Sequence, residues 1–251
     1  MKNATTTVKN TAESHLLFAP ERKIIDAESA MKMAERCSDY NDSRSEARNF
    51  KCLEFQGVTF KDQDLSGAEC QYSIFTDCIF DSVNLSRLSA EFATFQNCQW
   101  QNCCLENANF SFATISDSNL YNCCCNGADF PFCHGNFAAT SCNMERVTAN
   151  NADLHLIFSN VNALGFEANC ARLELDVTGS SLRRSEFNDG KISGKIENTD
   201  LTNSEFQRCS NLAKIVDCAT NGMDTEDSYG DDFGDDELEE ALNELEEGLL
   251  D

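Results

Sequence analysis

The residues of this chain with the greatest capacity for chemistry are its cysteines and histidines. Residues 102–130, NCCLENANFSFATISDSNLYNCCCNGADF, hold a cysteine doublet and a cysteine triplet, and the 251-residue chain has 15 Cys and three His in all. Cysteines ligate metals, form disulfides or act as redox groups. Few histidines accompany them and no C-x-x-C pair of zinc-site spacing occurs, so the sequence favours packing over a metal site.

The N-terminal residues indicate whether these thiols are expected to be free or joined in disulfides. Residues 1–15, MKNATTTVKNTAESH, lack the apolar stretch of a secretory signal peptide, and the number of cysteines is odd. We therefore expect a cytoplasmic protein with free thiols. No apolar run approaches the roughly 20 residues that a membrane-spanning helix needs, so no membrane partner is expected.

The charge of the chain excludes direct nucleic-acid binding as the expected function. The formal net charge is −24, whereas a protein that neutralises phosphates needs a basic surface. Residues 50–223 carry 21 acidic and 11 basic side chains, a net charge of −10, and residues 224–251 carry 14 acidic side chains and no Lys or Arg. More than half of the excess negative charge therefore belongs to the C-terminal tail.

An internal repeat of five residues organises the chain from residue 53. Sixteen consecutive units end with ADFPF, and their third place is large and apolar in most units, while the first place is small or apolar. Two inward positions separated by one outward position are typical of a short extended segment. A period of five fits neither a helix nor a long strand. The repeat therefore predicts short strands joined by regular turns in a solenoid.

The sequence resembles the pentapeptide-repeat family, whose motif is a small residue, Asp or Asn, Leu or Phe, and two polar residues. GADF at 127–130, NADL at 151–154 and TDLTNSEF at 199–206 carry the resemblance. It implies an all-β fold, a right-handed quadrilateral β-helix with four pentapeptides, and so twenty residues, in each coil. We expect this solenoid to occupy residues 50–223.

A coil of twenty residues predicts which positions the cysteines occupy. Residues twenty apart would stack at the strand spacing of about 4.8 Å. The small inward position would then hold the pairs Cys78/Cys98 and Cys103/Cys123 as compact apolar filler, and an outward position would hold Cys104 and Cys124. The large inward position would form two ladders, which are Phe55, Phe75, Phe95, Ile115 and Phe60, Phe80, Trp100, Leu120.

The repeat slips in two places. The stretch 131–137, PFCHGNF, adds two residues and is expected to leave the wall as a short loop, either a tolerated insertion or a loop that contacts a partner through Pro131, Phe132 and His134. Residues 155–184 are expected to hold a second loop or a distorted coil. Neither His134 nor His155 has a nucleophile and an orienting carboxylate that the sequence assembles, so no catalytic residue, cofactor or metal is expected.

The ends of the chain are expected to differ from the solenoid. Residues 1–20 should be a flexible leader, which alternatively addresses a type III secretion system, and residues 21–49 a helical cap over the open first coil. Residues 224–251 should be an acidic tail with an amphipathic helix. That helix would dock on the solenoid, on a second copy in a homodimer, or on another protein, through Asp235, Asp236, Leu238, Leu242, Leu245 and Leu249.

The resemblance implies a function without catalysis. Some pentapeptide-repeat proteins are acidic rods that look like DNA, bind DNA gyrase or topoisomerase IV, and protect or inhibit the enzyme, which gives resistance to antibiotics. The first hypothesis is such a DNA-mimicking binder of a type II topoisomerase. The alternative is a scaffold or secreted effector that engages another protein through its acidic C-terminal helix or its N-terminal leader.

Overall fold

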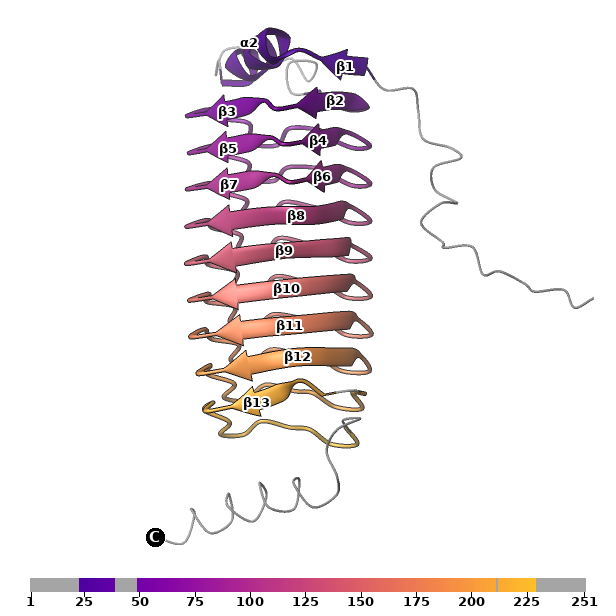
Figure 1. The fold of residues 1–251 in the computed structure, drawn as a ribbon, viewed down its shortest axis with the longest axis vertical. Coiled ribbons are helices and arrows are strands. Elements are labelled where there is room, and N and C mark those ends of the chain that lie inside the picture. Colours follow the sequence, from indigo (N-terminus) through magenta and orange to yellow (C-terminus); the bar gives the residue numbers. More distant parts are fainter. Residues whose placement is uncertain (1–22, 39–48, 211, 229–251) are drawn as a thin grey trace, which may run out of the picture.

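The residues described by the computed structural model, 23–38, 49–210 and 212–228, form one solenoid (Figure 1). Its 13 strands belong to a single sheet in which every strand pairs in parallel with a strand of the next coil. The principal path runs β1-β2-β4-β6-β8-β9-β10-β11-β12-β13, and β3, β5 and β7 form a second row that joins it at β8. The predicted all-β β-helix is confirmed.

The strands are short in the first coils and longer in the later ones. The three-to-four-residue strands at the N-terminal end are β1 Lys23–Ile25, β2 Leu53–Gln56, β3 Thr59–Lys61, β4 Ile74–Thr76, β5 Ile79–Asp81, β6 Thr94–Gln96 and β7 Gln99–Gln101. The later strands are β8 Thr114–Tyr121, β9 His134–Thr140, β10 Asp153–Ser159, β11 Arg172–Thr178, β12 Lys191–Glu197 and β13 Lys214–Val216.

One helix, α2 (Ala27–Ser38), lies at the N-terminal end of the described solenoid and contacts β2 and β3 (Figure 1). Its start is capped by Asp26, whose Oδ1 accepts a hydrogen bond of 2.8 Å from the amide of Ser29. The sequence predicts a helix here, but it does not predict the preceding strand β1, which pairs with β2. Because the chain is extended there, Ile25 is buried while Ile24 is 73% exposed.

Left-handed backbone turns make the corners of the first coils. Every fifth residue from Cys52 to Phe132 has a positive φ, near 50° to 67°, and most of these residues are not glycine. Each non-glycine residue in this conformation costs about 1 to 2 kcal/mol, with Asn and Asp the most tolerant. The repeated backbone hydrogen bonds to the next coil offset that cost, as from Asp62 N to Asp81 O at 3.0 Å.

The core of the first coils consists of the two predicted aromatic ladders, which are confirmed. Phe75 stacks on Phe55 and Phe95 with ring centroids 4.9 Å apart in both pairs, and Phe80 stacks on Phe60 at 5.1 Å and on Trp100 at 5.7 Å. All six rings are at most 3% exposed. Burial of this kind contributes roughly 1.5 to 3 kcal/mol for each large side chain.

The predicted loop at 131–137 is wrong, because these residues stay in the wall of the solenoid. Cys133 and Phe137 are buried, and His134 begins β9, which pairs with β8 and β10. What changes is the length of the coil. Thr114 pairs with His134 twenty residues later, but Ser118 pairs with Phe137 nineteen residues later. One residue, and with it one corner, is therefore lost from each later coil.

The predicted loop or distortion at 155–184 is also wrong. β10 pairs with β11 over all seven residues at a constant spacing of nineteen, and β11 pairs with β12 in the same way. Left-handed corners now occur three to a coil, for example at Asn160, Gly165 and Cys170. A coil of nineteen residues is as regular as one of twenty, but its spacing is not a multiple of five.

Candidate protein-interaction surface

An aromatic row runs along one outer corner of the first coils. Tyr72, Phe92, Phe112 and Phe132, the corner ladder, have positive φ values and stack with ring centroids 4.8 to 5.0 Å apart and planes within 5° of parallel. Tyr72 is 38% exposed, and Phe112 and Phe132 are each 42% exposed. These rings lie on the outside of the rod, although their stacking follows the same one-coil spacing as the core.

The three residues predicted to contact a partner near the slip lie at the end of the corner ladder. Phe132 is its last ring, Pro131 precedes it and is half-buried, and His134 is exposed at the start of β9. They are neighbours on one corner, but they belong to the wall and not to a loop. Whether they contact a partner stays a prediction.

A row of carboxylates runs along another outer face of the later coils. Glu167, Glu186, Glu205 and Asp224, the acidic column, are connected by successive parallel bridges, nineteen residues apart. Each is exposed or half-buried. At the strand spacing the column places one carboxylate about every 4.8 Å. Like charges in directly opposed positions repel, so the fold holds these groups together against their electrostatic preference.

Neighbouring amides reduce this repulsion. Gln207 Nε2 donates a hydrogen bond of 2.5 Å to Asp224, and this bond is the main reason that the pKa of the Asp224 carboxyl lies below its usual value. Asn188 Nδ2 lies 3.5 Å from Glu205. Asn188 and Gln207 are aligned one coil apart, since the backbone N–H of Gln207 donates a hydrogen bond of 2.9 Å to the side-chain Oδ1 of Asn188. The acidic column is therefore held in place by side chains of the adjacent row.

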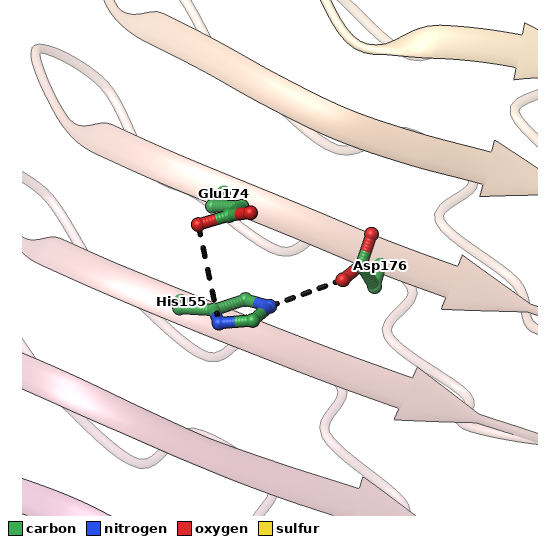
Figure 2. A group of neighbouring side chains, drawn as sticks. All are labelled: His155, Glu174 and Asp176. Carbon is green, nitrogen blue, oxygen red and sulfur yellow. Dashed lines mark hydrogen bonds and ion pairs between the residues drawn. The ribbon is translucent and has the colours of Figure 1, made fainter.

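A histidine and two carboxylates form a third group, on the strands β10 and β11 (Figure 2). His155 Nε2 lies 3.1 Å from Asp176 Oδ2, and His155 Nδ1 lies 4.0 Å from Glu174 Oε2. The side chains of His155, Glu174 and Asp176 are 33%, 58% and 48% exposed. Within the described part of the chain, His155 is thus paired with carboxylates and not with a serine or cysteine nucleophile.

The cysteine doublet and triplet are explained by packing. Cys103 and Cys123 are buried, and their thiols donate to the carbonyl oxygens of Phe80 and Trp100 at 3.3 and 3.4 Å. Burial raises the pKa of Cys125 well above its usual value. The 14 cysteines that the structure describes are free thiols. The predicted filler role of the inward cysteines is confirmed.

The outward cysteines stack as the spacing predicts. Cys104 and Cys124 are bridged in parallel and half-buried. Burial is also the main cause that raises the pKa of Cys124. Thiolates are the nucleophilic and metal-binding form, so this shift lowers the reactivity of Cys124.

The interior of the solenoid offers little space to a ligand. Two voids between the aromatic side chains, one beside Phe75 and one beside Phe130, have volumes of only about 10 Å³ each. A shallow hollow of about 440 Å³ lies instead on the outer face, and its lining includes His134, His155 and Glu174. Contacts with other molecules therefore concern the outer surface.

The other predicted partner-binding residues, in the tail, lie outside the described residues. They are Asp235, Asp236, Leu238, Leu242, Leu245 and Leu249. None of the described helices is long and apolar enough to cross a membrane.

Sequence reasoning also missed the corner ladder, the acidic column and the histidine group. An aromatic residue every twentieth position from residue 72, and an acidic residue every nineteenth from residue 167, were signals for the first two.

Comparisons with known proteins agree with this architecture. Residues 91–124 match the family model of pentapeptide repeats, with 8 copies. None of the curated proteins matches the chain.

Two solved structures are among those similar to this one. QnrB1, a plasmid-mediated fluoroquinolone resistance protein, is 20% identical with a TM-score of 0.44, over 78% of this chain and 92% of that one. HetL, a pentapeptide repeat protein involved in heterocyst differentiation regulation from the cyanobacterium Nostoc sp. strain PCC 7120, is 13% identical with a TM-score of 0.32, over 81% of this chain and 94% of that one.

Three observations agree on the repeat architecture of the chain. Its sequence repeats every five residues from residue 53, its coils turn at every fifth residue from Cys52 to Phe132, and the family model matches within that region. Residues 91–124 of the chain are therefore pentapeptide repeats, and the period and the corners extend the same repeat from residue 53 to Phe132.

Proposed function

We propose that the protein is a non-enzymatic rod that binds another protein in the cytoplasm, and that its partner is a type II topoisomerase, DNA gyrase or topoisomerase IV. The rod would occupy the DNA-binding surface of the enzyme and so inhibit it or protect it from a drug. The observation that carries the proposal is the acidic column, because it gives the rod a straight line of negative charge.

The spacing of the column supports an imitation of DNA. A DNA strand carries one phosphate for about every 3.4 Å of its axis, and the column carries one carboxylate about every 4.8 Å. The two densities differ by less than a factor of two. A surface that binds phosphates with Lys and Arg would meet a comparable row of charges here. The rigidity of the solenoid adds to this, since the row needs no ordering on binding.

The test is a supercoiling and cleavage-complex assay with purified DNA gyrase, with and without a fluoroquinolone. The full-length protein should inhibit supercoiling or restore it in the presence of the drug. The column variant E167Q/E186Q/E205Q/D224N should lose this effect. The matched control D62N/D77N/E106Q/D117N removes four exposed carboxylates from the first coils, equals the column variant in net charge, and should retain the effect.

The outcomes separate the proposal from its alternatives. If neither protein acts on gyrase or topoisomerase IV at a large excess over the enzyme, the topoisomerase proposal is wrong. If both four-site variants lose the effect to the same extent, net charge and not the column carries the interaction, and if both retain it, the column does not carry it. A variant that ends at Ser228 should act like the full-length protein, whereas an adaptor that works through its acidic tail would lose its partner. Sedimentation of the same samples tests the predicted homodimer.

A further inference from the structure

The outer face of the seven-residue strands carries functional groups on a part of the coil different from the acidic column. Along β10 the side chains alternate, so that Leu154, Leu156 and Phe158 are buried while Asp153 and His155 point outward. The strands are in register over seven residues. Outward residues of adjacent strands therefore lie side by side, and the backbone that positions them is a regular parallel sheet.

The register brings a nitrogen and two carboxylates together. Glu174 is the direct partner of His155 across the strand pair, and Asp176 lies two residues further along β11, so all three side chains share the outer face (Figure 2). One donor atom from each side chain lies within 4.8 Å of the others. Ligands about 2.1 Å from one metal ion are separated by at most about 4.2 Å, so the exposed side chains must draw together to hold one ion between them.

We propose that His155, Glu174 and Asp176 form a binding site for a divalent transition-metal ion of the zinc class. An imidazole nitrogen favours Zn²⁺ and similar ions over Mg²⁺ and Ca²⁺, which prefer oxygen ligands alone. Three protein ligands leave at least one coordination position for water or for a side chain of another protein. The ion would link two adjacent coils. The proposal does not depend on the topoisomerase function.

The surroundings of the group are compatible with an ion. Beside Asp176 on the next coil lies Lys195, but its ammonium group pairs with Glu197 at 2.8 Å. Beside Glu174 on the next coil lies Ser193, which is small and lines the hollow of about 440 Å³ together with Glu174 and His155. The two carboxylates supply the negative charge that a dication needs, and the hollow leaves room for its water ligands.

The test is titration calorimetry of the full-length protein with Zn²⁺. Replacing a residue that only orients a metal ligand weakens binding by about 10- to 100-fold, so removing a ligand in His155→Asn should weaken this site by about 100-fold or more. E174Q and D176N should weaken it by about 10-fold or more. The matched control is His134→Asn, which removes the outward histidine of the neighbouring strand β9 and should leave the affinity unchanged.

A second probe separates this site from the thiols. Co²⁺ bound by nitrogen and oxygen ligands should show visible d–d bands without the near-ultraviolet charge-transfer band that thiolate ligands add, and His155→Asn should remove these bands. Excess Mg²⁺ should not displace Zn²⁺. All four residues replaced are at the surface, and thermal unfolding of each metal-free variant should match the wild type. Equal Zn²⁺ affinity of the His155→Asn and His134→Asn variants, or a thiolate-type Co²⁺ spectrum that His155→Asn leaves intact, would overturn the proposal.

Discussion

The solenoid consists of two regions that differ by one residue in each coil. From Leu53 to Cys133 a coil has twenty residues and four left-handed corners, and from His134 onward it has nineteen residues and three. In the first region β4 and β5 are separate three-residue strands on either side of a corner, whereas β10 is one seven-residue strand. Where the corner residue is lost, one seven-residue strand such as β10 takes the place of two short segments, and its buried and outward side chains alternate.

The two regions also differ in chemistry. The first is filled by stacked aromatic rings, whereas the inward rows of the second are mostly aliphatic, as Leu154 and Leu173 are in β10 and β11. Residues 50–145 hold 11 acidic and 3 basic side chains, and residues 146–223 hold 10 acidic and 8 basic ones. The first region therefore has the more cohesive core, and the second has the more varied outer face, where both proposed sites lie.

The largest expected difference between the regions concerns their cores. Phe95 stacks on Phe75 at 4.9 Å and contacts Trp100 and Phe110 at ring distances of 5.3 and 5.7 Å. Phe95→Ala should lower the free energy of unfolding by about 3 to 5 kcal/mol, and the aliphatic counterpart Leu156→Ala by about 2 to 5 kcal/mol, nearer the lower end. Urea denaturation checks both values. A larger loss for Leu156→Ala would contradict the view that the aromatic core is the more cohesive.

The second prediction concerns the point where the coil length changes. Gly135 has a φ of +119°, and a Cβ atom added to it would lie 1.8 Å from the carbonyl oxygen of Ile115. Gly135→Ala should therefore lower the free energy of unfolding by about 3 kcal/mol or more, since backbone strain alone contributes about 1 to 3 kcal/mol. The matched control is Gly222→Ala, at a corner with a φ of +67°.

At Gly222 the nearest atom to an added Cβ is Oδ1 of the Asn203 side chain, at a clashing 2.4 Å, and this side chain can move away. The expected loss there is about 1 kcal/mol, the usual penalty of the left-handed conformation. The same denaturation experiment compares the two variants. Equal losses would show that the junction at Gly135 is no tighter than an ordinary corner.

The third prediction concerns the corner ladder. Phe112 stacks on Phe92 at 4.9 Å and on Phe132 at 4.8 Å. An aromatic pair contributes about 0.5 to 1.5 kcal/mol, so Phe112→Ala should lower the free energy of unfolding by about 1 to 3 kcal/mol. Cys170 continues the same corner in the second region and is exposed. Cys170→Ala should have almost no effect, and a similar loss in both variants would mean that the exposed stacking is not stabilising.

Much of the first region was predictable from the sequence, because one period governs both chain and structure. The spacing of twenty places Phe55 beside Phe75, and it places Cys103 beside Cys123. The second region could not be predicted in this way. The loss of one corner residue shifts the five-residue pattern along the sequence just as an insertion does. The shifted position of Phe137 in the sequence therefore predicted a loop, although Phe137 is a buried residue of a regular strand.

The candidate sites were predictable only in part, for the same reason. Pro131, Phe132 and His134 are close in the sequence, and the slip drew attention to them. The acidic column and the histidine group repeat at nineteen residues, and a reading in multiples of five does not align Glu186 with Glu205. Side-chain orientation adds a second difficulty, since the approach of His155 to Asp176 depends on a diagonal contact across the sheet that no spacing in the sequence reveals.

The smallest expected effect concerns two kinds of carboxylate in the second region. One is paired with a basic side chain, and the other is aligned with further carboxylates. Asp189 binds Arg208 through two bonds of 2.6 and 2.8 Å, and the hydrogen bond from Arg208 is the main cause that lowers the pKa of the Asp189 carboxyl. A carboxyl whose pKa is lower in the folded than in the unfolded protein stabilises the fold above the unfolded pKa of about 3.9, and this stabilisation is lost as the pH falls through the lowered value. Asp189→Asn should therefore lower the melting temperature at pH 7, and the difference from wild type should disappear below about pH 4.

Glu186 provides the opposite case, because it lies between two other carboxylates of the acidic column. Glu186→Gln removes repulsion and should raise the melting temperature at pH 7. Both changes should shrink in 1 M salt, since exposed charges are screened over about 3 Å at that concentration. The double variant D189N/R208Q should be no less stable than D189N alone, because the pair is already broken. A melting temperature that falls in Glu186→Gln would mean that the column is stabilised by its amide neighbours more than it is strained by its own charge.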